Sequence, residues 1–431
     1  MKIVRKERPM KVYGVPQWTQ LVLLAFALCV TIPSTAQEHL RPSATAIPKA
    51  FFGLHIHKGA TTTPWPSIPF GSLRLWDCYC TWADIEPQKG KWNFNLLDKF
   101  IDLAEQHGVD ILLPIGMPPP WASARPNEPP DFRKGSAAEP RNMEDWDDYV
   151  RTLGTRYKGR VRYWELWNEP NLKQFYTGDP QHLVAIEKDA YGILTRLDAS
   201  NRLVSPSPTG DYTGPSWLDS FLASGGGSFA NIIGFHLYVT PKAPEAMVPL
   251  IQKVQKVLVS HQLLAYKPIW DTETGWFIHS DVKPVQGTSI FPVVEADNAA
   301  AYVIRTYVLA WAAGVQRLFW YDWDSAAMGL SEQGKAAKPA ATAYGEVYNW
   351  LVGSVMNTCD SDRSGTWVCQ LGREGNYSGY IVWNAQGPRD FPIPKGWNII
   401  NERDASGKSR SMTASHLQIG LSPVLLENKV R

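Results

Sequence analysis

The pattern that most constrains this chain is an alternation of short apolar runs with longer amphipathic stretches, which begins near residue 50. Eight apolar runs of strand length occur, at 51–56, 72–76, 110–115, 161–167, 202–205, 232–237, 268–272 and 316–321. Between or after them lie stretches of helical periodicity, at 96–106, 145–157, 183–197, 245–260, 296–313 and 340–351. Strands that alternate with helical segments in this way predict parallel strands covered by helices.

Eight strand–helix units in one unbroken series favour a closed α/β barrel, the (β/α)8 TIM barrel, over an open doubly wound sheet. Such a barrel takes roughly 250 residues, which fits the span 50–352. The first apolar run is not followed by the glycine-rich turn that binds nucleotides, which also disfavours the doubly wound fold. We therefore expect residues 50–352 to form a (β/α)8 barrel, whose strand ends would carry the catalytic groups.

Beyond residue 352 the texture of the sequence changes. Short β-type runs separated by Gly, Asn, Asp and Pro occur at 367–371, 380–383, 397–400 and 423–426. They predict a small all-β, sandwich-like side domain over residues 353–431, packed on the barrel. Residues 37–49 form an N-terminal segment that is a candidate for an additional strand of this domain.

Residues 1–36 have the layout of a secretory signal peptide. A basic stretch precedes the apolar run 21–32, and small residues ending at Ala36 supply a cleavable site. A retained membrane anchor is the alternative, but the apolar run is short for a membrane span. Removing this segment, which holds five basic residues and one acidic residue, changes the formal charge from +2 to −2. We therefore expect a secreted or periplasmic protein with no membrane association after cleavage and no electrostatic affinity for nucleic acid.

Four cysteines remain after cleavage at Ala36. Cys359 and Cys369 flank a turn-rich segment, so a hairpin disulfide between them is plausible in an oxidising compartment, although the sequence alone leaves it open. Cys78 and Cys80 are too close together for an easy mutual bridge and are interpreted as buried thiols. The Cys and His spacings do not match a metal site, and we expect neither a metal nor a cofactor.

Two glutamates follow non-adjacent strands of the predicted barrel. The fourth strand, 161–167, ends in Asn168-Glu169-Pro170, and period-two alternation puts Glu165 and Glu169 on one side with Glu169 at the mouth. The seventh strand, 268–272, leads directly into Glu273. In barrels of this kind the catalytic groups lie at the C-terminal ends of the strands, so Glu169 and Glu273 are expected to face each other across the mouth.

Cleavage of a glycosidic bond with retention requires such a pair. One carboxylic acid protonates the leaving oxygen and the other carboxylate attacks the anomeric carbon, with the two groups about 5–5.5 Å apart. We assign Glu169 as the acid/base and Glu273 as the nucleophile. Arg74, at the end of the second strand, is the candidate cation that keeps the nucleophile ionised; an ion pair at the surface or barrel base is the alternative. Glu165 is interpreted as a deeper, buried hydrogen-bonding support.

Three segments resemble glycoside hydrolase family 39, in clan A of the (β/α)8 retaining glycosidases. The segment 164–176 reads Trp-Glu-Leu-Trp-Asn-Glu-Pro-Asn-Leu-Lys-Gln-Phe-Tyr and is similar to the acid/base signature of that family. The segments 85–94 and 268–276 are similar as well, the second being where the clan carries its nucleophile. The resemblance extends over about residues 50–352, and the C-terminal β domain fits clan members that carry a side sandwich.

The resemblance implies further roles at the mouth. Asn168 would hydrogen-bond the sugar 2-hydroxyl, and Tyr238 of the motif His236-Leu237-Tyr238 would hold the nucleophile, with His236 near the sugar. Trp323, preferred over Trp320, would be the aromatic platform that the clan places at the eighth strand.

Three more residues are substrate-binding candidates by their position alone. His55 and His57 end the first strand on one side, where each either binds a hydroxyl or belongs to the scaffold. Trp121, in the third loop, is a candidate for a neighbouring subsite.

The predicted partner is an oligo- or polysaccharide, and the predicted function is that of a secreted retaining β-glycoside hydrolase. A transglycosylase that uses the same glycosyl-enzyme intermediate, an inverting hydrolase and a non-catalytic carbohydrate-binding barrel are the alternatives. A binding barrel would normally have lost one carboxylate, whereas this chain keeps both. The loops 118–141 and 277–295 are long and match no substrate-specific signature, so the sugar, the linkage, endo or exo action and the oligomeric state stay open.

Overall fold

The computed structural model describes residues 37–129, 133–280 and 292–430. Its larger part is a parallel eight-stranded sheet with the order β6-β5-β4-β3-β2-β9-β8-β7. The strands are β2 Phe52–His55, β3 Ser72–Arg74, β4 Asp110–Ile115, β5 Tyr163–Leu166, β6 Arg202–Val204, β7 Ile233–Phe235, β8 Ile269–Thr274 and β9 Val315–Trp320. A parallel bridge between Val204 and Ile232 joins the two ends of this order, so the sheet closes. The prediction of a (β/α)8 barrel is confirmed.

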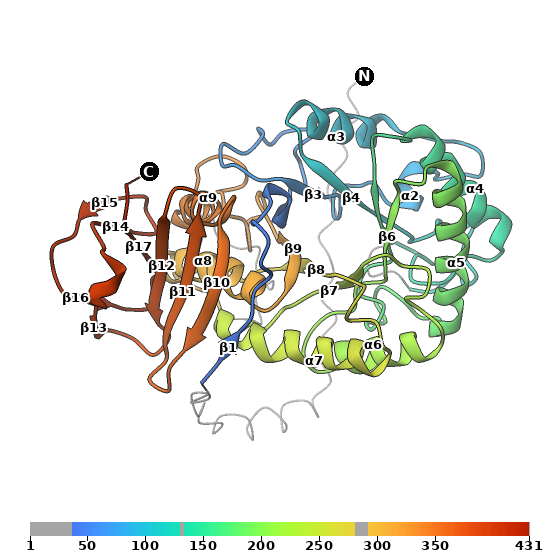
Figure 1. The fold of residues 1–431 in the computed structure, drawn as a ribbon. Helices are drawn as coiled ribbons and strands as arrows, with labels where there is room; N and C mark the ends of the chain where they lie inside the picture. Colours follow the sequence, from blue (N-terminus) through green and yellow to red (C-terminus); the bar gives the residue numbers. More distant parts are fainter. Residues whose placement is uncertain (1–36, 130–132, 281–291, 431) are drawn as a thin grey trace, which may run out of the picture.

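Helices surround the barrel (Figure 1). They are α2 Trp82–Ile85, α3 Asn95–Gln106, α4 Met143–Arg156, α5 Pro180–Leu197, α6 Gly214–Ala223, α7 Met247–Ser260, α8 Ala296–Ala312 and α9 Pro339–Leu351, with 3-10 turns η2 Lys49–Phe51 and η3 Pro244–Ala246. The sequence pattern did not predict α2 or α6. The first is a single turn, and the second begins in a segment rich in Gly, Pro and Ser and buries mainly Leu218, Phe221 and Leu222.

Local chemistry fixes where the helices begin. The side chain of Asn142 accepts a hydrogen bond from the backbone N–H of Asp145, which satisfies a free donor in the first turn of α4. Asp179 does the same for His182 at the start of α5, where Pro180 occupies the first helical position. Among the described residues, no helix is both long enough and apolar enough to span a bilayer. The predicted signal peptide, 1–36, lies outside the described residues.

A separate β domain packs beside α8 and α9 (Figure 1). Its seven-stranded sheet has the order β1-β10-β11-β12-β17-β14-β15, and β13 and β16 form a second, two-stranded sheet. The strands are β1 His39–Leu40, β10 Val355–Ser361, β11 Thr366–Arg373, β12 Tyr377–Asn384, β13 Arg389–Pro392, β14 Asn401–Arg403, β15 Ser409–Ser411, β16 His416–Ile419 and β17 Val424–Glu427. The N-terminal segment therefore contributes an edge strand, since β1 pairs antiparallel with β10.

One predicted strand of this domain is wrong. The run 397–400 is not extended: Lys395–Trp397 is the 3-10 turn η4, and the strand begins only at Asn401. Asn398 adopts a left-handed conformation with φ of 52°, which ends the turn and prevents an extended run through this position.

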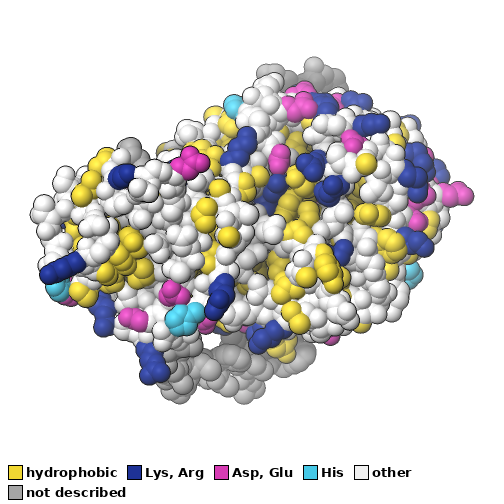
Figure 2. Space-filling view, in the orientation of Figure 1, with side chains coloured by type: hydrophobic (Ala, Val, Ile, Leu, Met, Phe, Trp, Pro, Cys, Tyr) yellow, Lys and Arg dark blue, Asp and Glu magenta, His cyan; other side chains and the backbone are white. Residues whose placement is uncertain are grey.

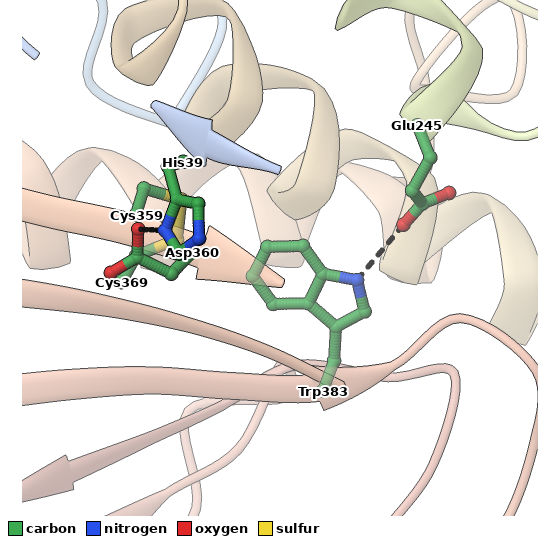
Figure 3. Close-up of a disulfide and its surroundings, with 6 residues drawn as sticks. All are labelled: His39, Glu245, Cys359, Asp360, Cys369 and Trp383. Carbon is green, nitrogen blue, oxygen red and sulfur yellow. Dashed lines mark hydrogen bonds and ion pairs between the residues drawn. A yellow bond between two sulfur atoms is a disulfide. The ribbon is translucent and has the colours of Figure 1, made fainter. Parts of the chain in front are cut away.

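The two domains are held together by buried polar contacts as well as by apolar packing. The indole Nε1 of Trp383 on β12 donates to Oε1 of Glu245 at 2.9 Å (Figure 3). Arg305 on α8 lies 3.3 Å from the same oxygen. A disulfide joins Cys359 on β10 to Cys369 on β11, while Cys78 and Cys80 are buried free thiols. On the face shown in Figure 2, basic and acidic side chains are interspersed.

Candidate active site

The barrel brings the two glutamates together at its C-terminal mouth. Glu273 is the fifth residue of β8, and Glu169 lies in the loop that follows β5. One carboxylate oxygen of each glutamate and one ring nitrogen of His236 all lie within 4.8 Å of one another. Both glutamates are almost buried, with 8% of Glu169 and 7% of Glu273 exposed. This separation is close to that of carboxylates that cleave glycosides with retention and is too short for the inverting arrangement.

Arg74 at the end of β3 is the centre of the buried polar network. Its Nε lies 2.5 Å from Oε2 of Glu165, its Nη1 donates to Oε2 of Glu273 at 2.8 Å, and its Nη2 donates to Oδ1 of Asn168 at 2.8 Å. Glu165 is fully buried, and Ser207 also donates to it at 2.5 Å. Glu165 therefore acts as the buried support that the sequence indicated, and it fixes the guanidinium that contacts Glu273.

The surroundings of Glu169 favour its protonated form. Burial raises the pKa of Glu169 to about 7, which leaves a substantial protonated fraction near neutral pH. The Nδ1 atom of His236 lies 2.9 Å from Oε1 of Glu169. Burial also lowers the pKa of His236 to about 4, so its imidazole is neutral when Glu169 titrates. A carboxyl group kept protonated at neutral pH is what a general acid requires.

The surroundings of Glu273 differ in charge. Burial raises the pKa of Glu273, and the Arg74 guanidinium, 2.8 Å away, opposes that rise by stabilising the carboxylate. Arg74 acts electrostatically on both glutamates, but it donates a hydrogen bond directly only to Glu273, so the ionised form is favoured more at Glu273 than at Glu169. Tyr238 donates its hydroxyl hydrogen to the second oxygen, Oε1, at 2.9 Å, which leaves the carboxylate held from two sides.

A cavity of about 820 Å³ lies next to this network, since its wall includes Leu75, Trp76 and Asp77, the three residues that follow Arg74. Its wall includes His57, Trp76, Asp77 and Tyr321, and Asp77 interacts electrostatically with both glutamates. Asn168, whose Oδ1 accepts from Arg74, is 1% exposed, and its Nδ2 donor has no hydrogen-bond partner within the described part of the chain. That donor is free to bind a sugar hydroxyl, as the resemblance implies for Asn168.

The structure separates the roles of the two histidines of the first strand. His55 is fully buried, its Nε2 lies 3.1 Å from the carbonyl oxygen of Thr272, and burial lowers its pKa well below the usual value. His57 lines the cavity, and its Nδ1 pairs with Asp322 at 3.2 Å. His57 is thus the substrate-binding candidate of the two, and His55 belongs to the scaffold.

The two predicted aromatic subsites are not part of the cavity wall. Trp323 is 4% exposed and packs in the main hydrophobic core, and a sugar platform at this residue stays a prediction. Trp121 donates its Nε1 to the carbonyl oxygen of Glu86 at 3.0 Å and meets Trp82 edge-on, so it packs against the segment after α2.

The cavity instead presents Tyr321, Trp76 and Asp77, which the sequence analysis did not select. Tyr321 directly follows β9, and its hydroxyl donates to Oδ2 of Asp77 at 2.6 Å. The signal for Tyr321 was its position at the very end of the eighth apolar run. The predicted platform, Trp323, lies two residues further on.

Two groups of His and carboxylate side chains in the described residues have the spacing of metal ligands: Glu169 with His236 and Glu273, and His57 with Asp322 and Asp324. Protein donors already engage both. Arg74 and Tyr238 contact Glu273, whereas Asp324 accepts hydrogen bonds from the backbone of His57 and Lys58 and from the Thr63 hydroxyl.

A closed (β/α)8 barrel with two buried glutamates opposed at its mouth defines the class of retaining (β/α)8 glycosidases. The chain belongs to glycoside hydrolase family 39, because the model of "Glycosyl hydrolases family 39" matches residues 73–307. It is 30% identical over 191 residues to a protein named "Beta-xylosidase" from Caldicellulosiruptor saccharolyticus. That match covers 38% of this chain and only 39% of the relative.

Solved structures show the same architecture. A family 39 glycoside hydrolase from the gut symbiont Bacteroides cellulosilyticus WH2 superposes with a TM-score of 0.68 at 20% identity, covering 88% of this chain and 81% of that one. A family 39 β-xylosidase from Caulobacter crescentus gives 0.63 at 16% identity, covering 90% and 98%. At these identities the likeness shows the fold, barrel and side domain together.

Proposed function

We propose that this protein is a secreted or periplasmic retaining β-glycoside hydrolase that acts on oligo- or polysaccharides, with Glu169 as acid/base and Glu273 as nucleophile. The observation that carries the proposal is the unequal environment of two carboxylates within 4.8 Å of one another: burial raises the pKa of Glu169 to about 7, while Arg74 stabilises the ionised form of Glu273. Export is supported by the basic stretch and the apolar run within residues 1–36.

In the first half-reaction Glu273 attacks the anomeric carbon, and the bond from that carbon to the leaving oxygen breaks. Glu169 gives its proton to the leaving oxygen, so the aglycone departs as a neutral alcohol. The product on the enzyme is a glycosyl ester of Glu273. Asn168 is placed to donate its unpartnered Nδ2 hydrogen to a sugar hydroxyl near the reacting carbon.

In the second half-reaction the ionised Glu169 takes a proton from water, and the water oxygen attacks the anomeric carbon. The ester bond breaks, Glu273 returns to its carboxylate form, and the sugar leaves with the configuration it had in the substrate. Arg74 and Tyr238 stabilise the charge that returns to Glu273. A sugar hydroxyl in place of water would give transglycosylation through the same intermediate.

β-Xylosides are the first substrates to test, because the curated relative is named "Beta-xylosidase". The experiment compares the purified mature protein with Glu273→Gln on aryl β-glycosides and a panel of β-glycans, both proteins being checked for folding. We expect sugar release by the wild type alone and a loss of about 10⁴-fold or more in the variant, as for removal of other enzymatic nucleophiles. If the folded wild type releases no sugar from any substrate of the panel, hydrolysis of these substrates is contradicted.

The assignment of Glu169 has its own test. In Glu169→Ala, formation of the glycosyl-enzyme should be slowed least for aryl glycosides with good leaving groups, since these need no proton. Azide, a small nucleophile that needs no general base, should then restore turnover and yield a β-glycosyl azide. If azide restores no activity on activated substrates, the acid/base role belongs to another residue.

A further inference from the structure

We propose that Asp77 is a specificity-determining residue of the sugar cavity, which accepts hydrogen bonds from neutral sugar hydroxyls and excludes sugars that carry a carboxylate. The inference deepens the proposed function and rests on it, because it concerns discrimination among substrates at the same site. Three features carry it: the fixed position of Asp77, the free oxygen that it presents, and the excess of carboxylates around it.

Asp77 is held in position by its backbone and by Tyr321. It lies three residues beyond Arg74, the last residue of β3, and adopts the left-handed conformation with φ of 56°. The Tyr321 hydroxyl donates to its Oδ2 at 2.6 Å, and the Tyr321 ring lies 5.1 Å from that of His57. The carboxylate is therefore fixed between the ends of β3 and β9, where it faces the cavity.

The second oxygen of Asp77, Oδ1, is free to bind substrate. Within the described residues it accepts no hydrogen bond, and Asp77 makes no ion pair. The other acidic residue of the cavity wall differs, because Asp84 is paired with Arg133. A fixed carboxylate with one free oxygen accepts hydrogen bonds from sugar hydroxyls, which are donors, and repels a sugar carboxylate, which offers no donor when ionised.

The surrounding charges reinforce this preference. The single positive charge of Arg74 already faces two carboxylates, Glu165 and Glu273, so it does not compensate the charge of a substrate anion. Arg133, which also lines the cavity, is paired with Asp84, and His57 faces Asp322 and lies in the same cluster as Asp324. Among the described groups around the cavity, carboxylates thus outnumber cations. A carboxylated sugar would enter a site of its own sign, partly shielded from water, where repulsion is stronger than in bulk solvent.

The test compares two substrates that differ only at C6, an aryl β-glucoside and the corresponding aryl β-glucuronide. We expect the wild type to prefer the glucoside in kcat/KM, and Asp77→Asn to raise the glucuronide-to-glucoside ratio by about tenfold, with a smaller change at high salt. Tyr321→Phe keeps the charge but removes the hydrogen bond that positions it. It should lower kcat/KM for the glucoside and leave the exclusion of the glucuronide largely in place.

The matched control is Asp390→Asn, which removes one negative charge from the exposed surface of the side domain and should leave the ratio unchanged. The same preference can be measured without turnover, as the ratio of the binding affinities for the two glycosides. Both glycosides are titrated calorimetrically into Glu273→Gln and Glu273→Gln/Asp77→Asn. Failure of hydrolysis with a shifted binding ratio would overturn the proposed function and keep the role of Asp77. An unchanged ratio in folded Asp77→Asn, or a wild type that prefers the glucuronide, would overturn the inference.

Discussion

The two ends of the barrel bury very different side chains, although the same strands supply both. At the mouth Arg74 donates hydrogen bonds to Glu165 and Glu273, and Glu169 lies beside His236. A second cluster, nearer the base, is apolar. Its members come from or directly precede different strands of the barrel: Leu112, Val204, Ile232, Trp270 and Phe319, with Tyr163 packed against them. The apolar cluster stabilises the closed sheet, and the polar side chains at the mouth are the groups that the closed barrel holds in position.

Each end also buries an arginine, and the comparison of the two is instructive. Burial opposes the charge of Arg74, but Glu165 and Glu273 outweigh it and raise its pKa. Burial lowers the pKa of Arg317 near the base, where its guanidinium lies 4.1 Å from the Trp270 ring centroid and 4.4 Å from that of Tyr163. Ion pairs therefore hold Arg74 in position, whereas ring stacking holds Arg317. Substitutions of the two arginines should differ in their effects on stability and activity.

The largest effect is expected from Arg74→Met. It removes the cation from two buried carboxylates, and breaking a buried pair by removing one partner costs about 3–5 kcal/mol of stability. Glu273 would lose the charge that keeps it ionised, so the acidic limb of the kcat/KM profile should move to higher pH. Urea unfolding and a pH–rate profile on an aryl β-xyloside measure the two effects.

The double variant Arg74→Met/Glu165→Gln is the control for Arg74→Met. Neutralising Glu165 removes one of the uncompensated charges, so stability should recover in part while activity stays low. Full recovery of activity in the double variant would mean that Arg74 acts only as scaffold.

At the base, Leu112→Ala should have the opposite profile. Leu112 is fully buried in the apolar cluster, and truncation of such a side chain costs about 2–5 kcal/mol through lost burial and a cavity. Leu112 pairs with Arg74 between β4 and β3 but contributes only apolar packing, so we expect the kcat of the folded enzyme to fall by less than about tenfold, far less than in Arg74→Met. A large loss of kcat with little loss of stability would show that the two ends are coupled.

Much of this arrangement could be read from the sequence, because barrel strands alternate with helices at a regular spacing. All eight apolar runs became barrel strands, with bounds that differ by a few residues. The side domain was less predictable. Its strands are short, and the left-handed Asn398 turns an apolar run into the 3-10 turn η4. Such a conformation depends on local hydrogen bonding and packing, which hydrophobic periodicity does not report.

Prediction of the site residues from the sequence was limited in the same way. Glu169, Glu273, Asn168, Arg74 and Tyr238 meet because each closely follows or ends a strand, which sequence patterns locate well. Trp323 and Trp121 lie in loops, where direction depends on tertiary contacts such as the bond from Trp121 to the carbonyl of Glu86. Asp77 was missed for that reason, whereas Tyr321 directly follows β9 and was within reach of the sequence pattern; their mutual hydrogen bond marks them as a pair.

The pH profile of kcat/KM tests the raised pKa of Glu169 at the mouth. Burial raises the pKa of Glu169 to about 7, and only the protonated form can act as the acid. Above that value kcat/KM on substrates that need protonation should fall about tenfold per pH unit, and below it this limb should be flat. Glu169→Ala should abolish the basic limb. If the limb persists in the variant, another group is responsible for it.

The smallest effect is expected from Arg317→Met, the counterpart of Arg74→Met. The variant loses cation–π contacts worth about 0.5–2 kcal/mol, but it also removes the cost of burying the charge, and methionine fills a similar volume. Its partner Asp110, 3.0 Å from Nη2, has a side chain that is 47% exposed, so water can solvate the carboxylate left behind. Stability should therefore change by about 1 kcal/mol or less, with kcat/KM unaffected. A loss as large as that of Arg74→Met would show that burial of the arginine, and not the exposure of its partner, decides the cost.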